Sequence, residues 1–500
     1  MPVTRRDLLT AAAAVGASGV AVTALYGSGR SAFAGAARFQ RPLAIPPLLQ
    51  GEVRDGVRRF DLTLQRGQRE FLDGMQTPTA GINGAFLGPV IRVRRGEQVR
   101  LDVANRLGEA STLHWHGVHL PAKMDGGPHQ VIEAGATWSP RFRIRQPAST
   151  QWYHSHLFHR TGVQVYYGLA GLFYIDDDQG DALGLPSDHG VDDIPLVLQD
   201  RSFARDGSFR YLTSMHDRML GMTGDVMLVN GVVLPFLRVR RRLTRFRILN
   251  GSNARIYNLA FSDGRRFLQI ASDGGLLPRP VPLTSVRLSP GERAEILLEM
   301  TPEDDLQLVH VPPPARRARG GGMMGMMQGM MRSDDQPFSI MRLIGSGLED
   351  AGTRPPRRLV EVPAWSEDEA VKTRRFVLEM GMGMMGGGGF RINGRAMDMN
   401  RIDETVRLGA VEIWEIVNRS PMAHPFHIHD IQFRILDRDG RPPPAGEQGL
   451  KDTVLVEPQE TVRVITRFEH YADADSPYMF HCHILEHEDA GMMGQFVVVA

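Results

Sequence analysis

Alternation of apolar and polar residues runs through most of this 500-residue chain and predicts β-strands. The pattern is clear at residues 60–64 (FDLTL), 90–95 (VIRVRR) and 99–104 (VRLDVA). A period of two directs one face of a strand to a core and the other to solvent. Glycine and proline clusters separate these segments at short intervals, as in β-sandwiches. From about residue 55 onward we therefore expect an all-β protein.

One pattern occurs three times along the chain. Each copy has an Asn-Gly turn, an alternating strand, a second alternating strand and a final asparagine. The copies span residues 82–105, 229–250 and 392–418. Repeats of this kind, about 150 residues apart, predict three similar β domains. We place these domains at residues 45–178, 190–345 and 360–500, with polar or Gly/Pro-bearing connections between them.

Two tracts consist largely of glycine and methionine, at residues 320–332 and 380–389. Glycine at this density cannot build a core, because it favours the unfolded chain. Methionine thioethers are soft ligands that select Cu(I), so the tracts suggest recruitment of cuprous ions. The alternative is a flexible linker that binds nothing.

The first 34 residues resemble an export signal. Arg5 and Arg6 precede an apolar run at residues 11–25, and Ala-Phe-Ala at residues 32–34 follows as a cleavage site. Paired arginines before such a run are similar to a twin-arginine signal. A membrane anchor is the alternative, but the run is short for a span and contains glycines. We expect an exported, periplasmic protein with no membrane span in its mature form.

Composition narrows the function classes. The chain has 58 basic and 57 acidic residues, so its charge suggests neither nucleic acid nor a membrane surface as partner. We expect a monomer. A single cysteine among 500 residues cannot form an intramolecular disulfide, which directs attention to thiol reactivity or metal binding.

The lone cysteine stands in a dense pattern of metal ligands. Cys482 lies between His481 and His483, and His487 and Met492 follow. A thiolate, imidazoles and a thioether are the ligand set of a blue-copper site. On a strand, the two flanking histidines would face one way and the cysteine the other, so one tripeptide would serve two metal sites. A buried structural cysteine is the alternative.

Further histidines occur in pairs two residues apart, the spacing that projects both imidazoles from one face of a strand. Four such pairs exist: His114/His116, His154/His156, His427/His429 and His481/His483. His424 precedes His427 by three residues and therefore falls on the opposite face, together with Cys482. Zinc is the main competing metal, but a zinc site needs four ligands and would leave most of these histidines unexplained.

These segments resemble the four copper motifs of the multicopper oxidases. HWHG, YHSH, HPFHIH and HCHILEHEDAGMM, which begin at residues 114, 153, 424 and 481, occur in the family's order. The resemblance covers essentially the whole mature chain and is closest to the bacterial laccase and cuprous-oxidase branch. It implies three cupredoxin-like domains of the Greek-key β-sandwich or barrel type, and four copper ions.

The resemblance also implies a role for each ligand. It gives the type 1 copper His424, Cys482, His487 and Met492; the type 2 copper His114 and His427; and the type 3 pair His116, His154, His156, His429, His481 and His483. The trinuclear cluster would lie between the first and third domains, and the second domain would hold no ligand.

The implied reaction oxidises a reducing substrate one electron at a time at the type 1 copper. Electrons would pass through Cys482 to His481 and His483, and four of them would reduce dioxygen to two waters. The family pattern places acids for proton relay at Asp125 and Glu488. An ordinary turn or surface role is the alternative for both acids.

The reductant is open between Cu(I) and small phenols or aromatic amines. Met422 matches a methionine that borders the substrate copper in the cuprous-oxidase branch, but Ser420 stands where that branch has an acid. The nearby Met397, Asp398 and Met399 could compensate. Phenols would instead need an open apolar approach to His487.

Two other classes are less consistent with the sequence. A nitrite reductase also uses a type 1 copper but lacks four paired-histidine motifs. A non-catalytic exported copper-binding protein would not need the full ligand set that stands here.

Overall fold

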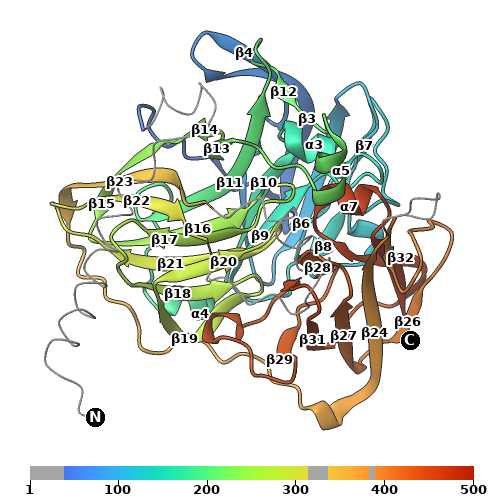
Figure 1. Cartoon of the computed structure of the whole chain (residues 1–500). Helices are drawn as coiled ribbons and strands as arrows, with labels where there is room; N and C mark the ends of the chain where they lie inside the picture. Colours follow the sequence, from blue (N-terminus) through green and yellow to red (C-terminus); the bar gives the residue numbers. More distant parts are fainter. Residues whose placement is uncertain (1–38, 313–335, 382–388) are drawn as a thin grey trace, which may run out of the picture.

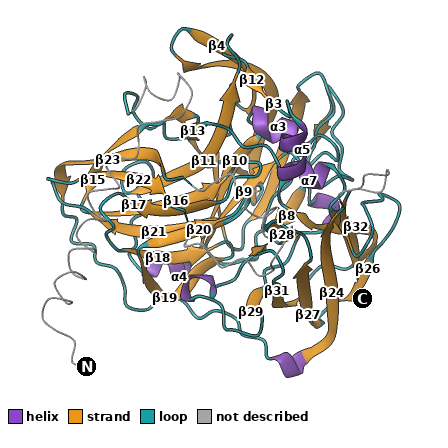
Figure 2. Cartoon of the chain, viewed as in Figure 1, coloured by secondary structure: helices purple, strands orange, loops and turns teal. Residues whose placement is uncertain are grey.

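The computed structural model describes residues 39–312, 336–381 and 389–500. Strands make up most of its regular structure, and the helices are few and short, as Figure 2 shows. The expected signal segment and the first Gly-Met tract lie outside the described residues, as do residues 382–388 of the second tract. Within the described ranges, no helix has the length and apolar character needed to cross a membrane.

The N-terminal part of the fold consists of two sheets, blue to cyan in Figure 1. One sheet has the order β1 (Leu48–Leu49), β5 (Val90–Arg94), β10 (Ala170–Asp176), β9 (Ser149–His154). The other has the order β2 (Glu52–Arg54), β3 (Val57–Leu72), β6 (Gln98–Arg106), β7 (Thr137–Trp138), with β4 (Met75–Ile82) beside β3 and β8 (Arg141–Arg143) beside β6. Its helical turns are η1 (Ala122–Met124), α3 (Thr161–Tyr167) and α4 (Asp178–Ala182).

The middle part also has two sheets, green to yellow in Figure 1. The larger has the order β14 (Val232–Val233), β13 (Val226–Val229), β11 (Asp193–Phe203), β16 (Leu243–Asn250), β21 (Arg293–Glu299), β18 (Phe267–Ser272), β19 (Gly275–Leu283), with β12 (Phe209–Arg210) beside β11. The smaller has the order β15 (Phe236–Arg241), β23 (Phe338–Glu349), β22 (Asp305–His310), β17 (Tyr257–Phe261), β20 (Ser285–Leu288). A short helix, α5 (Met215–Leu220), precedes β13.

The C-terminal part, orange to red in Figure 1, has two five-stranded sheets. One has the order β25 (Phe390–Ile392), β24 (Ala370–Met380), β27 (Val411–Asn418), β31 (Thr461–Arg467), β29 (Arg434–Arg438). The other has the order β26 (Glu404–Arg407), β33 (Met493–Val499), β32 (Asp473–Cys482), β28 (His424–Ile428), β30 (Thr453–Val456). Its helical turns are η2 (Glu367–Glu369), η3 (Ala445–Glu447) and α7 (Leu485–Asp489).

The three copies of the repeated pattern fold alike. In each copy the first strand joins one sheet of its pair and the second strand joins the other. The turn asparagines Asn83, Asn230 and Asn393 all have positive φ and accept a hydrogen bond from a backbone N–H of a neighbouring strand. The closing asparagines each donate to two backbone carbonyls. The asparagines recur because each fastens the same turn.

The sheet pairs occupy residues 48–176, 193–349 and 370–499. β23 thus extends past residue 345, and the exact domain limits remain a prediction. Near the start of the described chain, Leu43 donates its N–H to the carbonyl of Phe236 in β15, and Arg41 donates to the carbonyl of Glu70 in β3, so this segment contacts both the middle and the first sheet pairs.

Candidate metal centre

The His-Cys-His tripeptide lies directly opposite the His-Pro-Phe-His segment. β32 and β28 are antiparallel, and their register pairs His481 with His427 and Cys482 with Phe426. Residues opposite each other in such a pair point to the same side of the sheet, and successive residues point to opposite sides. The two histidines therefore leave one face of the sheet, and the cysteine leaves the other.

The cysteine side of the sheet gathers four buried ligand candidates. The Sγ atom of Cys482 lies 3.4 Å from Nδ1 of His424 and 3.7 Å from Nδ1 of His487. Met492 is buried in the same core. Its N–H donates a hydrogen bond to the His487 carbonyl, and its carbonyl accepts one from the Cys482 N–H. Burial lowers the pKa of His424 to about 3 and raises the pKa of the Cys482 thiol.

The opposite side is an enclosed cluster of eight imidazoles from the first and third sheet pairs, all 0–1% exposed. Burial, the largest effect, and repulsion between neighbouring rings lower the pKa of most of them: His116, His154, His156, His427, His429, His481 and His483. Neutral imidazole is the form that binds metals.

Three of these rings share one centre. The Nε2 atoms of His156, His429 and His481 lie 3.2 Å from one another. Their outer Nδ1 atoms face carboxylates: Glu488 is 3.2 Å from those of His156 and His481, and Asp125 is 2.7 Å from that of His429. Carboxylates on the outer nitrogen commonly orient metal-binding histidines.

A second group joins His116, His154 and His483. The Nδ1 atom of His116 lies 3.2 Å from Nε2 of His483, and the His154 and His483 ring centres are 5.5 Å apart. The Nδ1 atom of His154 is bonded to the Ser155 carbonyl, and its buried Nε2 has no protein partner.

The remaining two rings, His114 and His427, are held in the same way as His154. His114 and His427 each bond through Nδ1 to a backbone carbonyl, at 2.9 Å, from Asp125 and Asp452 respectively. Each is left with a buried Nε2 atom that has no protein partner. Buried polar atoms are nearly always satisfied. Nitrogen lone pairs that converge without donors fit a set of bound metal ions.

Both acids expected from the sequence lie at this cluster. Asp125 contacts His429 through its carboxylate and His114 through its carbonyl. Glu488 lies between His156 and His481, and burial raises its pKa well above the usual value for a glutamate. Sequence reasoning missed a third acid, Asp452, which belongs to no histidine motif.

The expected substrate residues do not gather in one place. Met422 lies beside Ser420, whose hydroxyl is 2.7 Å from Nε2 of His424. Met397, Asp398 and Met399 lie on a loop whose backbone is bonded to Gly491 and Gln495. No hydrogen bond or ion pair among the described residues joins that loop to Met422 or His424.

His487 is closed off from solvent, although phenol oxidation would require an open approach to it. Its Nε2 atom lies 3.1 Å from the carbonyl oxygen of Met219 in α5. The Phe390 ring stacks on the imidazole, with ring centres 4.0 Å apart. The structure therefore does not show the apolar opening that direct contact with a phenol needs.

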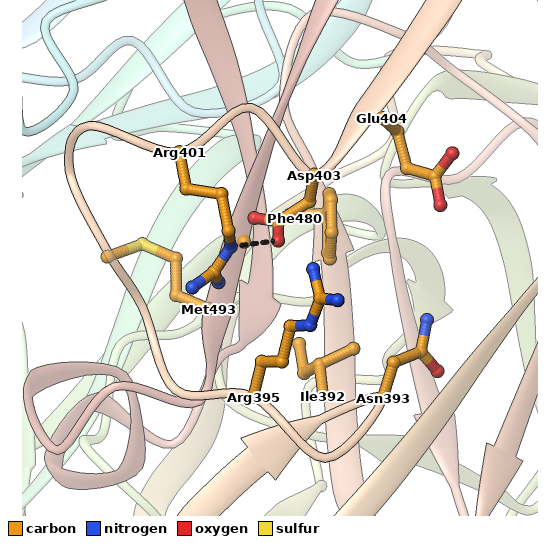
Figure 3. A pocket seen from close by; sticks show the side chains of 9 residues that line it. Ile392, Asn393, Arg395, Arg401, Asp403, Glu404, Phe480 and Met493 are labelled. Carbon is orange, nitrogen blue, oxygen red and sulfur yellow. Dashed lines mark hydrogen bonds and ion pairs between the residues drawn. The ribbon is translucent and has the colours of Figure 1, made fainter.

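A separate pocket of about 240 Å³ lies in the C-terminal part, between β26 and the turn after β25. Figure 3 shows Arg395 extending toward its centre and Arg401 paired with Asp403. The Arg401 and Asp403 side chains approach to 2.6 Å. Glu404 is paired with Arg374 outside the pocket. None of the metal-ligand candidates lines this pocket.

Comparison with known proteins agrees with this geometry. Sequence models described as multicopper oxidase match residues 63–180 and 371–500. The multicopper oxidase mco of Staphylococcus aureus is 36% identical over 450 residues, which cover 89% of each chain. The chain belongs to the multicopper oxidase family. Membership in this family implies a copper-dependent oxidoreductase that uses dioxygen, and the all-β, cupredoxin-like fold predicted from the sequence is confirmed.

Other relatives differ in their described roles. Cell division protein FtsP of Salmonella typhimurium is 36% identical over 472 residues, 93% of this chain and 94% of that one. A laccase-like multicopper oxidase CueO from Ochrobactrum sp., described as active towards lignin model compounds and lignosulfonate, is 39% identical, with a TM-score of 0.81, and covers 92% of this chain and 100% of its own. A Campylobacter jejuni enzyme described as a metallo-oxidase is 29% identical, with a TM-score of 0.80. The match covers 93% of this chain and 96% of that one.

Proposed function

We propose that this multicopper oxidase holds four copper ions, takes single electrons from a reducing substrate with Cu(I) as the favoured one, and reduces dioxygen to water. The observation that supports copper binding is the convergence of neutral, donor-free imidazole nitrogens around shared centres. We also propose that the enzyme is exported to the periplasm, on the basis of the paired arginines and the apolar run near its N-terminus.

The proposed ligand assignment follows the grouping of the rings. His424, Cys482, His487 and Met492 would hold the type 1 copper; His114 and His427 the type 2 copper; His156, His429 and His481 one type 3 copper; and His116, His154 and His483 the other. When bound, these ions would supply one-electron redox chemistry and the reduction of dioxygen.

The chain's own residues link the two sites and orient the ligands. Cys482 is covalently continuous with His481 and His483, so the backbone provides a short path between the two faces of the sheet. Asp125 and Glu488 hold the outer nitrogens of three rings and keep the inner nitrogens aimed at the shared centre. Both acids are buried and are the candidates for delivering protons to the cluster.

The covering of His487 favours Cu(I) over a bulky phenol. Met219 and Phe390 occupy the positions from which a phenol would contact the imidazole. A cuprous ion is small and can deliver its electron from the outer side of this cover. Met215 and Met219, one helical turn apart in α5, add soft thioethers at the same location.

Two rival functions have their own supporting observations. A laccase without a dedicated Cu(I) site is supported by the Ochrobactrum relative and by Ser420 in place of an acid. A non-catalytic exported copper-binding role is supported by the FtsP relative at equal identity to the S. aureus oxidase. The complete ligand set in this chain favours catalysis.

Oxygen consumption by the copper-loaded mature protein tests these alternatives, with Cu(I) and a bulky phenol as reductants. A variant without residues 320–331 runs in parallel. We expect Cu(I) oxidation to dominate and to fall in the deletion, while phenol turnover persists or rises. Dominant phenol turnover that is insensitive to the deletion would establish a laccase. Copper binding without oxygen uptake for either reductant would establish the non-catalytic role.

A further inference from the structure

A buried ion pair connects the middle sheets, which supply no metal-ligand candidate, to the histidine cluster. Arg293 begins β21, and its side chain is fully buried. Its two terminal nitrogens donate to both carboxylate oxygens of Asp452, at 2.8 and 2.6 Å. A bidentate, charge-assisted pair of this kind fixes direction as well as distance.

Asp452 in turn contacts two ligand candidates. Its Oδ1 atom lies 3.0 Å from Nε2 of His116, and its carbonyl oxygen lies 2.9 Å from Nδ1 of His427. Because an ionised carboxylate only accepts hydrogen bonds, His116 carries its proton on Nε2. Its Nδ1 lone pair then faces Nε2 of His483.

His116 is thereby reversed relative to the rest of the cluster. The other seven rings direct Nε2 inward, and six of them have Nδ1 against a carbonyl or carboxylate oxygen. Only His116 presents Nδ1 to the shared centre. Its geometry depends on an acceptor at Nε2, and Asp452 is that acceptor.

Arg293 is itself held on every side. Its nitrogens also lie within hydrogen-bond distance of the carbonyls of Thr150, Gly291 and Asp273, each at 3.0 Å, and of the side-chain oxygen of Gln151. These partners belong to the first and middle sheet pairs, whereas Asp452 belongs to the third. The guanidinium group therefore sits where all three parts of the fold meet.

The glycine of the HWHG motif makes room for this pair. Gly117 has φ +80°, and a Cβ atom there would lie 2.5 Å from an Asp452 carboxylate oxygen and 2.8 Å from an Arg293 nitrogen. Any side chain would push the ion pair away from His116. The motif and the ion pair are thus two parts of one arrangement.

We propose that Arg293 is a positioning residue for the histidine cluster. It holds the Asp452 carboxylate against Nε2 of His116, which leaves Nδ1 free to bind a copper ion. The inference rests on the proposed function, since it concerns the same metal centre. It adds that the middle part of the fold, although none of its described residues is a proposed ligand of the four coppers, determines which nitrogen of His116 faces the metal centre.

The test uses full-length mature protein with Asp452→Asn and Arg293→Lys. Arg293 donates to both oxygens of Asp452, so whichever way the amide of Asp452→Asn turns, its NH₂ meets a guanidinium N–H and the pair that fixes this side chain against His116 is broken. His116 then loses the fixed carboxylate acceptor that holds its proton on Nε2. We expect loss of at least one copper per chain and of the near-ultraviolet absorption of the coupled copper pair, with the blue thiolate absorption unchanged.

Arg293→Lys keeps the charge but loses the bidentate fork. We expect it to retain copper after purification and to release it to a chelator several-fold faster than the natural protein. Arg245→Lys is the matched control: Arg245 is also buried in the middle sheets, but it pairs with Glu295. It should match the natural protein in copper content and in chelator release.

The possible outcomes are distinct. Full copper content, unchanged near-ultraviolet absorption and unchanged chelator release in both variants would overturn the proposal. Equal loss of the blue absorption and of copper in Arg293→Lys and Arg245→Lys would overturn it as well, because the effect would then be general destabilisation. Failure of the natural protein to bind copper would instead refute the proposed function.

Discussion

The Nε2 atom of His487 lies 3.1 Å from the carbonyl oxygen of Met219. This hydrogen bond places α5, from the middle of the chain, over an imidazole near the C-terminus. Residues 211–222 around α5 are fastened at both ends to Glu486, which accepts from the Tyr211 hydroxyl at 3.0 Å and from the Met222 N–H at 2.9 Å. The segment therefore forms a strap over the proposed electron-entry site.

Tyr211→Phe should open this strap to larger substrates. Removing the hydroxyl deletes one hydrogen bond of about 1 kcal/mol, which is roughly a five-fold shift toward the open arrangement. We expect KM for a bulky phenol to fall several-fold, with the blue absorption unchanged. Steady-state oxygen uptake at varied phenol concentration measures this.

Tyr471→Phe is the control for that experiment. Its hydroxyl also forms one side-chain hydrogen bond, accepting from Arg145, but it lies on a different segment. It should leave phenol oxidation unchanged. Equal KM values in Tyr211→Phe and the natural protein would show that the strap does not limit access.

Ser420→Asp should improve oxidation of Cu(I). The serine hydroxyl lies 2.7 Å from Nε2 of His424, so a carboxylate at this position would reach the same nitrogen. It would also add an anionic oxygen ligand beside the Met422 thioether. We expect KM for Cu(I) to fall several-fold.

Ser420→Asn separates charge from size in this prediction. Asparagine has nearly the volume of aspartate but brings no charge, so it should not lower KM for Cu(I). An equal gain in both variants would mean that side-chain volume, rather than charge, improves the site. No gain in either would place the cuprous ion elsewhere, with α5 as the next position to examine.

Features that depend on local periodicity could be predicted from the sequence. Strand alternation and the His-x-His spacing follow from the backbone geometry of a single strand, and the recurring Asn83, Asn230 and Asn393 each fasten a local turn. The opposite faces assigned to His481 and Cys482 agree with the register of β28 and β32.

Features that depend on tertiary packing could not be predicted. Asp452 and Arg293 are 159 residues apart and belong to no motif, and only the assembly of three sheet pairs brings them together. The contact of Met219 with His487 joins residues 268 positions apart. Neither pairing leaves a periodic signal, because each depends on how whole sheets dock.

Met492→Leu should alter the blue site, whereas Met493→Leu should not. Both side chains are buried, and exchange of Met for Leu at nearly constant volume costs less than about 1.5 kcal/mol. Met492 is hydrogen-bonded through its backbone to Cys482 and His487, while Met493 lies opposite His481 on the other face. Loss of a weak axial thioether changes the reduction potential.

Redox titration of the blue absorption measures this difference. We expect the potential of Met492→Leu to rise and that of Met493→Leu to match the natural protein. Thermal melting of both variants checks that the fold is intact. A shift of the reduction potential in Met493→Leu alone would assign the axial position to Met493 instead of Met492.

Asp193→Asn should destabilise the protein at neutral pH, and this destabilisation should disappear in acid. Asp193 is fully buried, and Nε of Arg247 donates to it at 2.7 Å. Burial alone would raise the pKa of this carboxyl, but Arg247 and Arg245 together lower it below its usual value. Arg247 also contacts Glu295, but loss of the Asp193 charge leaves this buried cluster with one uncompensated positive charge, which costs about 3 kcal/mol.

The sign of the pH dependence follows from the lowered pKa. Above the unfolded-state pKa of about 3.9 the carboxylate contributes its full stability, and this contribution is lost as the pH falls through the lower folded-state value. The difference between Asp193→Asn and the natural protein should therefore be constant from pH 7 to 5 and shrink below pH 4, as measured by urea unfolding. Asp305→Asn, which breaks an exposed pair with Arg342, should cost less than about 1 kcal/mol. Equal destabilisation by both substitutions would show that burial of the Asp193 pair adds nothing to stability.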